Sequence, residues 1–273
     1  MRGTARNVYT RLVTANDPDL GVGVGENDSD DGGDDDGDDG PYRTSKLRQA
    51  RQRYAKLRDA DAYFKIDMTG VTTVMISLRQ SPVDPETGRV VTPYQQGEDL
   101  FQNMTAVMDS IRYALSQKRG FDVEWARIIS ATRQWATPHC HLYLWVDDPH
   151  DVVDSEWFRP AVAKFVERTP RASWESHDVE RGTVTVEHDP PRATDTYGEV
   201  GVVNSLRDIP PTAGCVYLGS QLPHFALAGD TEPWHIDRAV GAWVSSRNWF
   251  ATSRGFPSDD EVLKLKQSED DNN

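Results

Sequence analysis

The residues that most constrain the fold of this chain lie between Thr137 and Trp145. They are Thr-Pro-His-Cys-His-Leu-Tyr-Leu-Trp. The residues after the histidines are apolar or aromatic on both faces of the expected strand, which is typical of a strand in the centre of a sheet. Alternate side chains of a strand share a face, so His139 and His141 point the same way and Cys140 points the other way. Two imidazoles about 6 to 7 Å apart on one strand can hold one divalent ion.

Taken alone, two histidines on a strand are equally compatible with a structural role. Position 143 is Tyr, so the third alternating histidine of histidine-triad nucleotide hydrolases is missing, and the His-x-His-x-Asp-His run of metallo-β-lactamases is also missing. The chain has only two cysteines, Cys140 and Cys215, which argues against a closed zinc site and against a disulfide framework. The remaining metal site is an open one that needs a third ligand from elsewhere.

The segments around this strand predict further strands and helices in one folded domain. Alternation and β-branched residues predict strands over 71–78 and 182–187, and a strand over 123–132 is expected to form an antiparallel hairpin with the histidine strand. Helical spacing and composition predict helices over 44–62, 97–116, 154–168, 214–222 and 232–250. We therefore divide the chain into a disordered acidic tail (1–45), the folded domain (46–257) and a charged C-terminal tail (258–273).

The charge of the chain bears on a role with DNA. With 44 acidic and 30 basic residues, the net charge of −14 has the wrong sign for an ordinary DNA-binding protein. Part of the excess lies in the Asp- and Gly-rich run 26–39, and the rest resembles the acidic surface of salt-adapted proteins. The basic residues are 7 Lys and 23 Arg, and arginine makes bidentate phosphate contacts that lysine cannot make. An acidic DNA-binding enzyme is therefore compatible with a salty cytoplasm.

The helix predicted over 44–62 is the most basic segment. It is either a solvated charged face or a surface that contacts phosphates, and its basic residues are Arg48, Arg51, Arg53, Lys56 and Arg58.

No stretch of the chain approaches the ~20 apolar residues that a membrane-spanning helix needs, and the N-terminus has no apolar signal region. We expect a cytoplasmic protein that does not associate with membranes.

Five motifs follow one another along the chain. They are Tyr-Ala-Lys-Leu-Arg-Asp-Ala-Asp at 54–61, Thr-Thr-Val-Met-Ile-Ser-Leu at 72–78, Thr-Pro-His-Cys-His at 137–141, Val-Tyr-Leu-Gly-Ser-Gln-Leu at 216–222, and Trp-Phe-Ala-Thr-Ser-Arg-Gly at 249–255. In this order they resemble the HUH endonuclease superfamily. Within it, the series is most similar to rolling-circle replication initiators of haloarchaeal plasmids and pleomorphic haloarchaeal viruses, and the resemblance covers roughly residues 54–257.

The resemblance implies a fold and a metal site. The fold is α+β, with a central antiparallel sheet of four or five strands, ferredoxin- or RRM-like, helices on one face and the histidine strand in the middle. The ion is Mg²⁺ or Mn²⁺, held by His139 and His141. The Glu that the family would place before the hairpin turn is absent, and Gln134 is the nearest candidate for the third ligand.

The resemblance also implies the reaction. Tyr217, on the predicted helix 214–222, would attack the scissile phosphate and leave a 5′-phosphotyrosine and a 3′-hydroxyl that primes replication. Family members often carry Lys or a second Tyr one turn later, where this chain has Ser220 and Gln221. On a helix, Gln221 shares a face with Tyr217 and would also look toward the metal.

The implied substrate is single-stranded or hairpin origin DNA. A host helicase and a DNA polymerase are the expected partners, since the chain contains no P-loop. The sequence is compatible with a monomer or a homodimer. Arg247, Asn248 and Arg254 are the candidates for contact with the DNA strand. Two alternatives also stay open: a single-tyrosine HUH transposase, and a noncatalytic origin-binding or copy-control protein of the same fold. A mobilisation relaxase is disfavoured, because Tyr217 follows the histidines.

Overall fold

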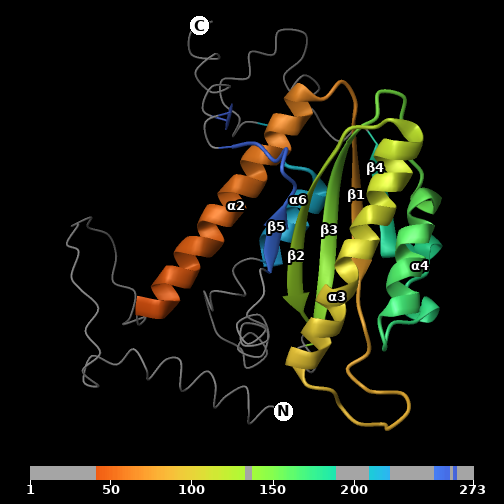
Figure 1. The fold of residues 1–273 in the computed structure, drawn as a ribbon. Coiled ribbons are helices and arrows are strands. Elements are labelled where there is room, and N and C mark those ends of the chain that lie inside the picture. The colour runs from red at the N-terminus through yellow and green to blue at the C-terminus, as the bar shows by residue number, and fades with distance from the viewer. Residues whose placement is uncertain (1–40, 133–136, 189–208, 222–248, 259–260, 263–273) are drawn as a thin grey trace, which may run out of the picture.

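A five-stranded antiparallel sheet in the order β4-β1-β3-β2-β5 forms the centre of the molecule (Figure 1). The structure is a computed structural model that describes residues 41–132, 137–188, 209–221, 249–258 and 261–262. The strands are β1 (Val71–Leu78), β2 (Val123–Ala131), β3 (Pro138–Asp147), β4 (Val184–His188) and β5 (Phe250–Thr252). The predicted α+β class and antiparallel sheet are confirmed, and the histidine strand, β3, lies in the middle.

Four α-helices accompany the sheet in the described part of the chain. They are α2 (Pro41–Asp67), α3 (Pro93–Arg112), α4 (Arg159–Arg168) and α6 (Ala213–Gln221), with a π-helical turn at Tyr113–Gln117 and a 3-10 turn at Ser155–Phe158. Within these described residues, none of the helices is both long and apolar enough to cross a bilayer. The disordered tail was predicted over 1–45: residues 1–40 lie outside the described part, whereas residues 41–45 belong to α2, so that boundary was wrong. Most of the helix predicted over 232–250 also lies outside the described part. That helix was predicted to end at Phe250, which instead begins β5.

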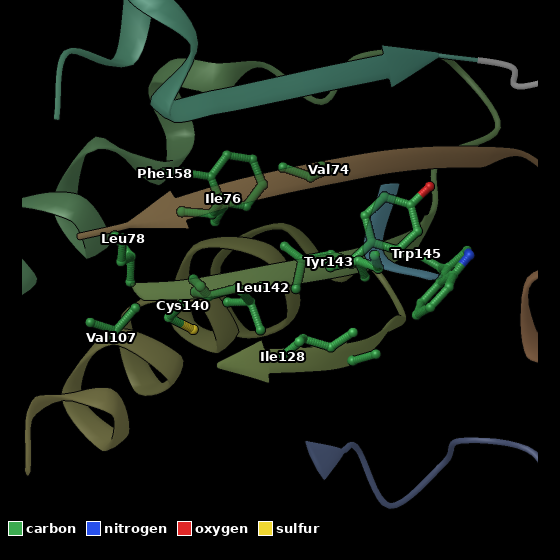
Figure 2. Close-up of a cluster of buried hydrophobic side chains, with 14 of the residues drawn as sticks. Val74, Ile76, Leu78, Val107, Ile128, Cys140, Leu142, Tyr143, Trp145 and Phe158 are labelled. Carbon is green, nitrogen blue, oxygen red and sulfur yellow. The ribbon is translucent and has the colours of Figure 1, made fainter. Parts of the chain in front are cut away.

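Both faces of the sheet are covered by helices, so the prediction of helices on one face is wrong. Cys140 and Leu142 point toward Val107 of α3 (Figure 2). On the other face, the ring of Trp145 lies against Phe64 of α2, with the two centroids 5.1 Å apart. The physical reason is that β3 is apolar on both sides, and each apolar face of a sheet must be removed from water.

The buried His177 forms a hydrogen bond with the backbone directly after the end of β1. The backbone N–H of Arg79 donates to Nε2 of His177 (3.1 Å), and Nδ1 of His177 lies 2.7 Å from the carbonyl oxygen of Ser173. These partners require the neutral imidazole with its proton on Nδ1. The ring is fully enclosed and packs against Phe165. Burial lowers the pKa of His177.

This lowered pKa predicts a loss of stability in mild acid. The unfolded chain binds a proton at His177 below about pH 6.5, whereas the folded chain resists it. The contribution of His177 to the free energy of unfolding is therefore complete above that pH and is lost as pH falls through the folded pKa. Urea unfolding between pH 7.5 and 5 is expected to show a smaller pH dependence for His177→Gln than for wild type. His150→Gln, at an exposed position, is the control and should keep the wild-type dependence.

Candidate active site

His139 and His141 lie on the face of the sheet that α2 and α6 cover. The β-ladder places Ser130 of β2 opposite His139 and Ser77 of β1 opposite His141. The two imidazole rings meet edge to face with their centroids 4.7 Å apart. His141 is buried and His139 is partly exposed. The strand alternation therefore places the two rings side by side, as the sequence predicts.

Ser77 fixes the orientation of His141. Its Oγ lies 3.0 Å from Nδ1 of His141, which leaves Nε2 facing the other way, toward α6. There the hydroxyl of Tyr217 lies 3.3 Å from Nε2. A histidine held at one ring nitrogen presents the other in a defined direction, which is the usual arrangement of a metal-binding or proton-accepting imidazole.

Tyr217 reaches this histidine from a separate element of the fold. Its ring meets that of His141 edge to face, with the centroids 5.0 Å apart. The residue as a whole is nevertheless 46% exposed, so Tyr217 lies at the surface of the molecule while its hydroxyl contacts His141 of the sheet. A nucleophile for a polymer substrate needs both properties, because the strand must reach the hydroxyl from solvent.

A buried polar network positions the start of α6. The Oγ1 of Thr212 accepts from the backbone N–H of Cys215 (3.3 Å) and caps the helix. The same Oγ1 donates to Oδ1 of Asp61 on α2 (2.8 Å), and the backbone N–H of Thr212 donates to Oδ2 of Asp61 (2.9 Å). The hydroxyl of Tyr143 donates to Thr212 from the sheet. Thr212 is thus held by α2 and β3 at the same time.

Asp61 is the centre of this network and carries a buried ion pair. It accepts from Nε1 of Trp145 (2.8 Å), and the Nζ of Lys65 lies 3.6 Å from its Oδ2, with the two side chains 0% and 1% exposed. Burial lowers the pKa of Lys65, and the charge of Asp61 opposes that shift. This role was not predicted from the sequence, because the helix was expected to end at residue 62, whereas α2 continues to Asp67 and so places Lys65 one turn after Asp61.

Two glycines let α6 approach its neighbours closely. A Cβ at Gly214 would lie 2.2 Å from the ring of Tyr143, and one at Gly219 would lie 2.3 Å from the ring of Tyr54 on α2. Neither distance is tolerated between real carbon atoms. The glycines therefore set how near α6 lies to the sheet and to α2, and with it the contact between Tyr217 and His141.

Gly214→Ala is expected to lower the free energy of unfolding by about 1 to 3 kcal/mol, the usual cost of an overpacked core. The ring of Tyr143 is buried and cannot turn away, so α6 has to shift. Urea unfolding measures the change. Val216→Ala, at a half-exposed residue of the same helix, is the matched control and should stay within about 0.5 kcal/mol of wild type. An equally stable Gly214→Ala would show that α6 is not held against Tyr143.

The donor set suits a divalent ion only in part. Ser77 holds Nδ1 of His141 and the Tyr217 hydroxyl contacts its Nε2, so an ion bound at Nε2 would take the place of that hydroxyl contact. His139 lies beside this ring and could supply a second imidazole ligand. Within the described residues there is no group of three His, Cys, Asp or Glu side chains that could hold a metal. Gln134, the predicted third ligand, lies outside these residues. Gln221 of α6 accepts from Ser130 (3.1 Å), opposite His139, and places an amide next to the pair.

Of the three predicted DNA-contacting residues, the described part of the chain includes Arg254. Arg247 and Asn248 lie outside the described residues. Arg254 is exposed in the turn after β5, where the neighbouring Ser253 donates its backbone N–H to the carbonyl of Trp125 (2.9 Å). That end of β2 is opposite to the end where Ser130 pairs with His139. The structure therefore does not bring Arg254 to the histidines.

No protein-family model, curated protein or solved structure matches the chain. The site itself consists of two adjacent imidazoles on the central strand of an α+β sheet, with the hydroxyl of the half-exposed Tyr217 against one of them.

Proposed function

We propose that this protein is a rolling-circle replication initiator that nicks single-stranded origin DNA with Tyr217 as its nucleophile. The observation that carries the proposal is the 3.3 Å contact between the Tyr217 hydroxyl and Nε2 of His141, residues that lie 76 positions apart in the chain. A long-range contact that orients an exposed phenol against a fixed imidazole is the arrangement of an activated nucleophile.

In the proposed reaction the phenolic oxygen of Tyr217 forms a bond to phosphorus and the bond from phosphorus to the 3′-oxygen breaks. The phenol loses its proton and the departing 3′-oxygen gains one, so the products are a 5′-phosphotyrosine and a 3′-hydroxyl. Ser77 holds His141, and the contact of His141 with Tyr217 places the attacking hydroxyl beside the histidine pair. An ion held at Nε2 of His141 would replace that contact, and Tyr217 would then lie next to the ion. When bound by His139 and His141, Mg²⁺ or Mn²⁺ would polarise the phosphate and neutralise the charge that develops on it.

The covalent product accounts for both halves of the replication cycle. The 3′-hydroxyl primes synthesis by a host polymerase, and a host helicase would separate the strands. The phosphotyrosine bond conserves the energy of the broken phosphodiester, so the displaced strand can be rejoined later by the reverse reaction without ATP. An exposed nucleophile is consistent with a strand that has to enter and leave.

The test uses 3′-labelled single-stranded oligonucleotides that tile the DNA of the protein's own replicon, incubated in high salt with Mn²⁺ or Mg²⁺. One oligonucleotide is expected to yield a labelled band that migrates with the protein on a denaturing gel, because the protein remains on the 5′ end of the labelled fragment. Chelation should abolish the band, and mass spectrometry of the digested adduct should place the nucleotide on Tyr217. Bound but intact DNA with both metals would contradict the proposal and favour a noncatalytic origin-binding protein.

A further inference from the structure

Arg53 of α2 lies on an aromatic surface at the edge of the face that carries the histidines. Its guanidinium carbon is 4.0 Å from the ring centroid of Trp249 and 5.7 Å from that of Phe250. The backbone N–H of Ile129 donates to the carbonyl of Trp249 (2.7 Å), so the tryptophan is fixed to the sheet. A planar guanidinium stacked on a fixed ring has a defined orientation.

Within the described part of the chain, the Arg53 guanidinium forms no ion pair with a carboxylate. Its Nη1 is enclosed and has no hydrogen-bond acceptor among the described residues, and no carboxylate of that part of the chain pairs with it. Burial lowers the pKa of Arg53, and no neighbouring acid opposes the shift. In a chain with 44 acidic residues, a half-buried arginine without a carboxylate is notable, since a buried charge is costly unless it is paired. The side chain as a whole is still partly exposed, so a partner from solvent can reach donors of the guanidinium other than the enclosed Nη1.

Arg53 is also close to the proposed reaction centre. The ladder aligns Phe250 of β5 with Ile128 of β2, and Ile128 with His141 of β3. These three residues form one row across the sheet, on one face. The row spans two strand spacings, or about 10 Å, a distance that a short stretch of single-stranded DNA can bridge.

We infer that Arg53 binds a backbone phosphate of the DNA strand a few nucleotides from the scissile phosphate, with Trp249 holding the guanidinium in place. This inference rests on the proposed function. Arginine suits such a site because its donors match phosphate oxygens in pairs while its face stacks on an aromatic ring. The contact supplies position and affinity without reading the bases.

The test measures binding of fluorescein-labelled dT20 and of a mixed-sequence 20-mer by anisotropy, in EDTA, with Tyr217→Phe as the common background so that no DNA is cleaved. Adding Arg53→Gln is expected to weaken both complexes by about 10-fold and to reduce the slope of log K against log salt by about 0.7. Arg51→Gln is the matched control: it removes the same charge from an exposed residue about 200° around the same helix. It should change the affinity less than 2-fold.

Arg53→Lys, which keeps the charge and loses the planar stack, should fall between the two, and circular dichroism and thermal melts of each variant establish that it is folded. Equal affinities for the Arg53→Gln and Arg51→Gln proteins would overturn the inference, and so would a loss that depends on the base sequence. If the Tyr217→Phe protein that retains Arg53 binds neither oligonucleotide, the inference fails, and the proposed function is decided separately by the adduct assay with the tiling oligonucleotides. A third outcome separates the two proposals. If that protein binds the oligonucleotides, if wild type forms the phosphotyrosine adduct, and if Arg53→Gln leaves the affinity unchanged, then only the inference fails.

Discussion

Asp61→Ala is expected to lower the free energy of unfolding by about 3 to 5 kcal/mol, the usual cost of removing one member of a buried ion pair. The substitution leaves the ammonium of Lys65 enclosed without its counter-charge. It also removes the acceptor for Nε1 of Trp145 and for both donors of Thr212. Because Thr212 caps α6, the damage should extend to the helix that carries Tyr217. Urea unfolding at pH 7.5 measures the change.

A double-mutant cycle separates the ion pair from the rest of the network. Asp61→Asn keeps one acceptor and removes the charge, so it should cost less than Asp61→Ala. Lys65→Met combined with Asp61→Asn removes both charges and should recover part of the loss, since the two residues are in contact and their effects do not add. Asp67→Ala, at an exposed carboxylate of the same helix, should stay within about 0.5 kcal/mol. A cost below about 1 kcal/mol for Asp61→Ala would show that the network does not hold α2 and α6 together.

The features predicted from sequence are those governed by local periodicity. Alternation over 137–145 is sufficient to place His139 and His141 on one face and Cys140 on the other, because the two-residue repeat of a strand admits no other arrangement. The helical spacing of Leu100, Met104, Val107 and Ile111 likewise predicts a helix with one buried face, and all four are buried. These inferences need no knowledge of what the elements touch.

The features that could not be predicted depend on long-range contacts. Helices cover both faces because α2 packs against Trp145, and no local pattern says against which face a helix will lie. Thr212 and Asp61 are 151 residues apart, so their pairing is invisible to any window along the chain. The sequence order placed Tyr217 after the histidines, but its contact with His141 depends on Gly214, Gly219 and the Asp61 network together.

Tyr217→Phe is expected to abolish formation of the covalent protein–DNA adduct, with a fall in rate of at least about 10³-fold, because the only change is the loss of the attacking oxygen. The ring that packs edge to face on His141 remains, and the lost hydroxyl belongs to a half-exposed residue. The free energy of unfolding should therefore change by no more than about 0.5 kcal/mol. Binding of single-stranded DNA in EDTA should also persist, since no phosphate contact is removed.

Tyr54→Phe is the matched control for this variant. Tyr54 lies on α2 with its ring against Gly219, so it belongs to the same surface and is exposed to a similar extent, 36% against 46% for Tyr217. It loses the same atom but has no contact with His141 in the described structure, and adduct formation should remain near the wild-type rate. Adduct that forms in the Tyr217→Phe protein at more than a tenth of the wild-type rate would assign the nucleophile to another tyrosine. Loss of the adduct in both variants would show that the hydroxyls of Tyr217 and Tyr54 are both needed to form the surface that binds the DNA, and it would not support Tyr217 as the attacking group.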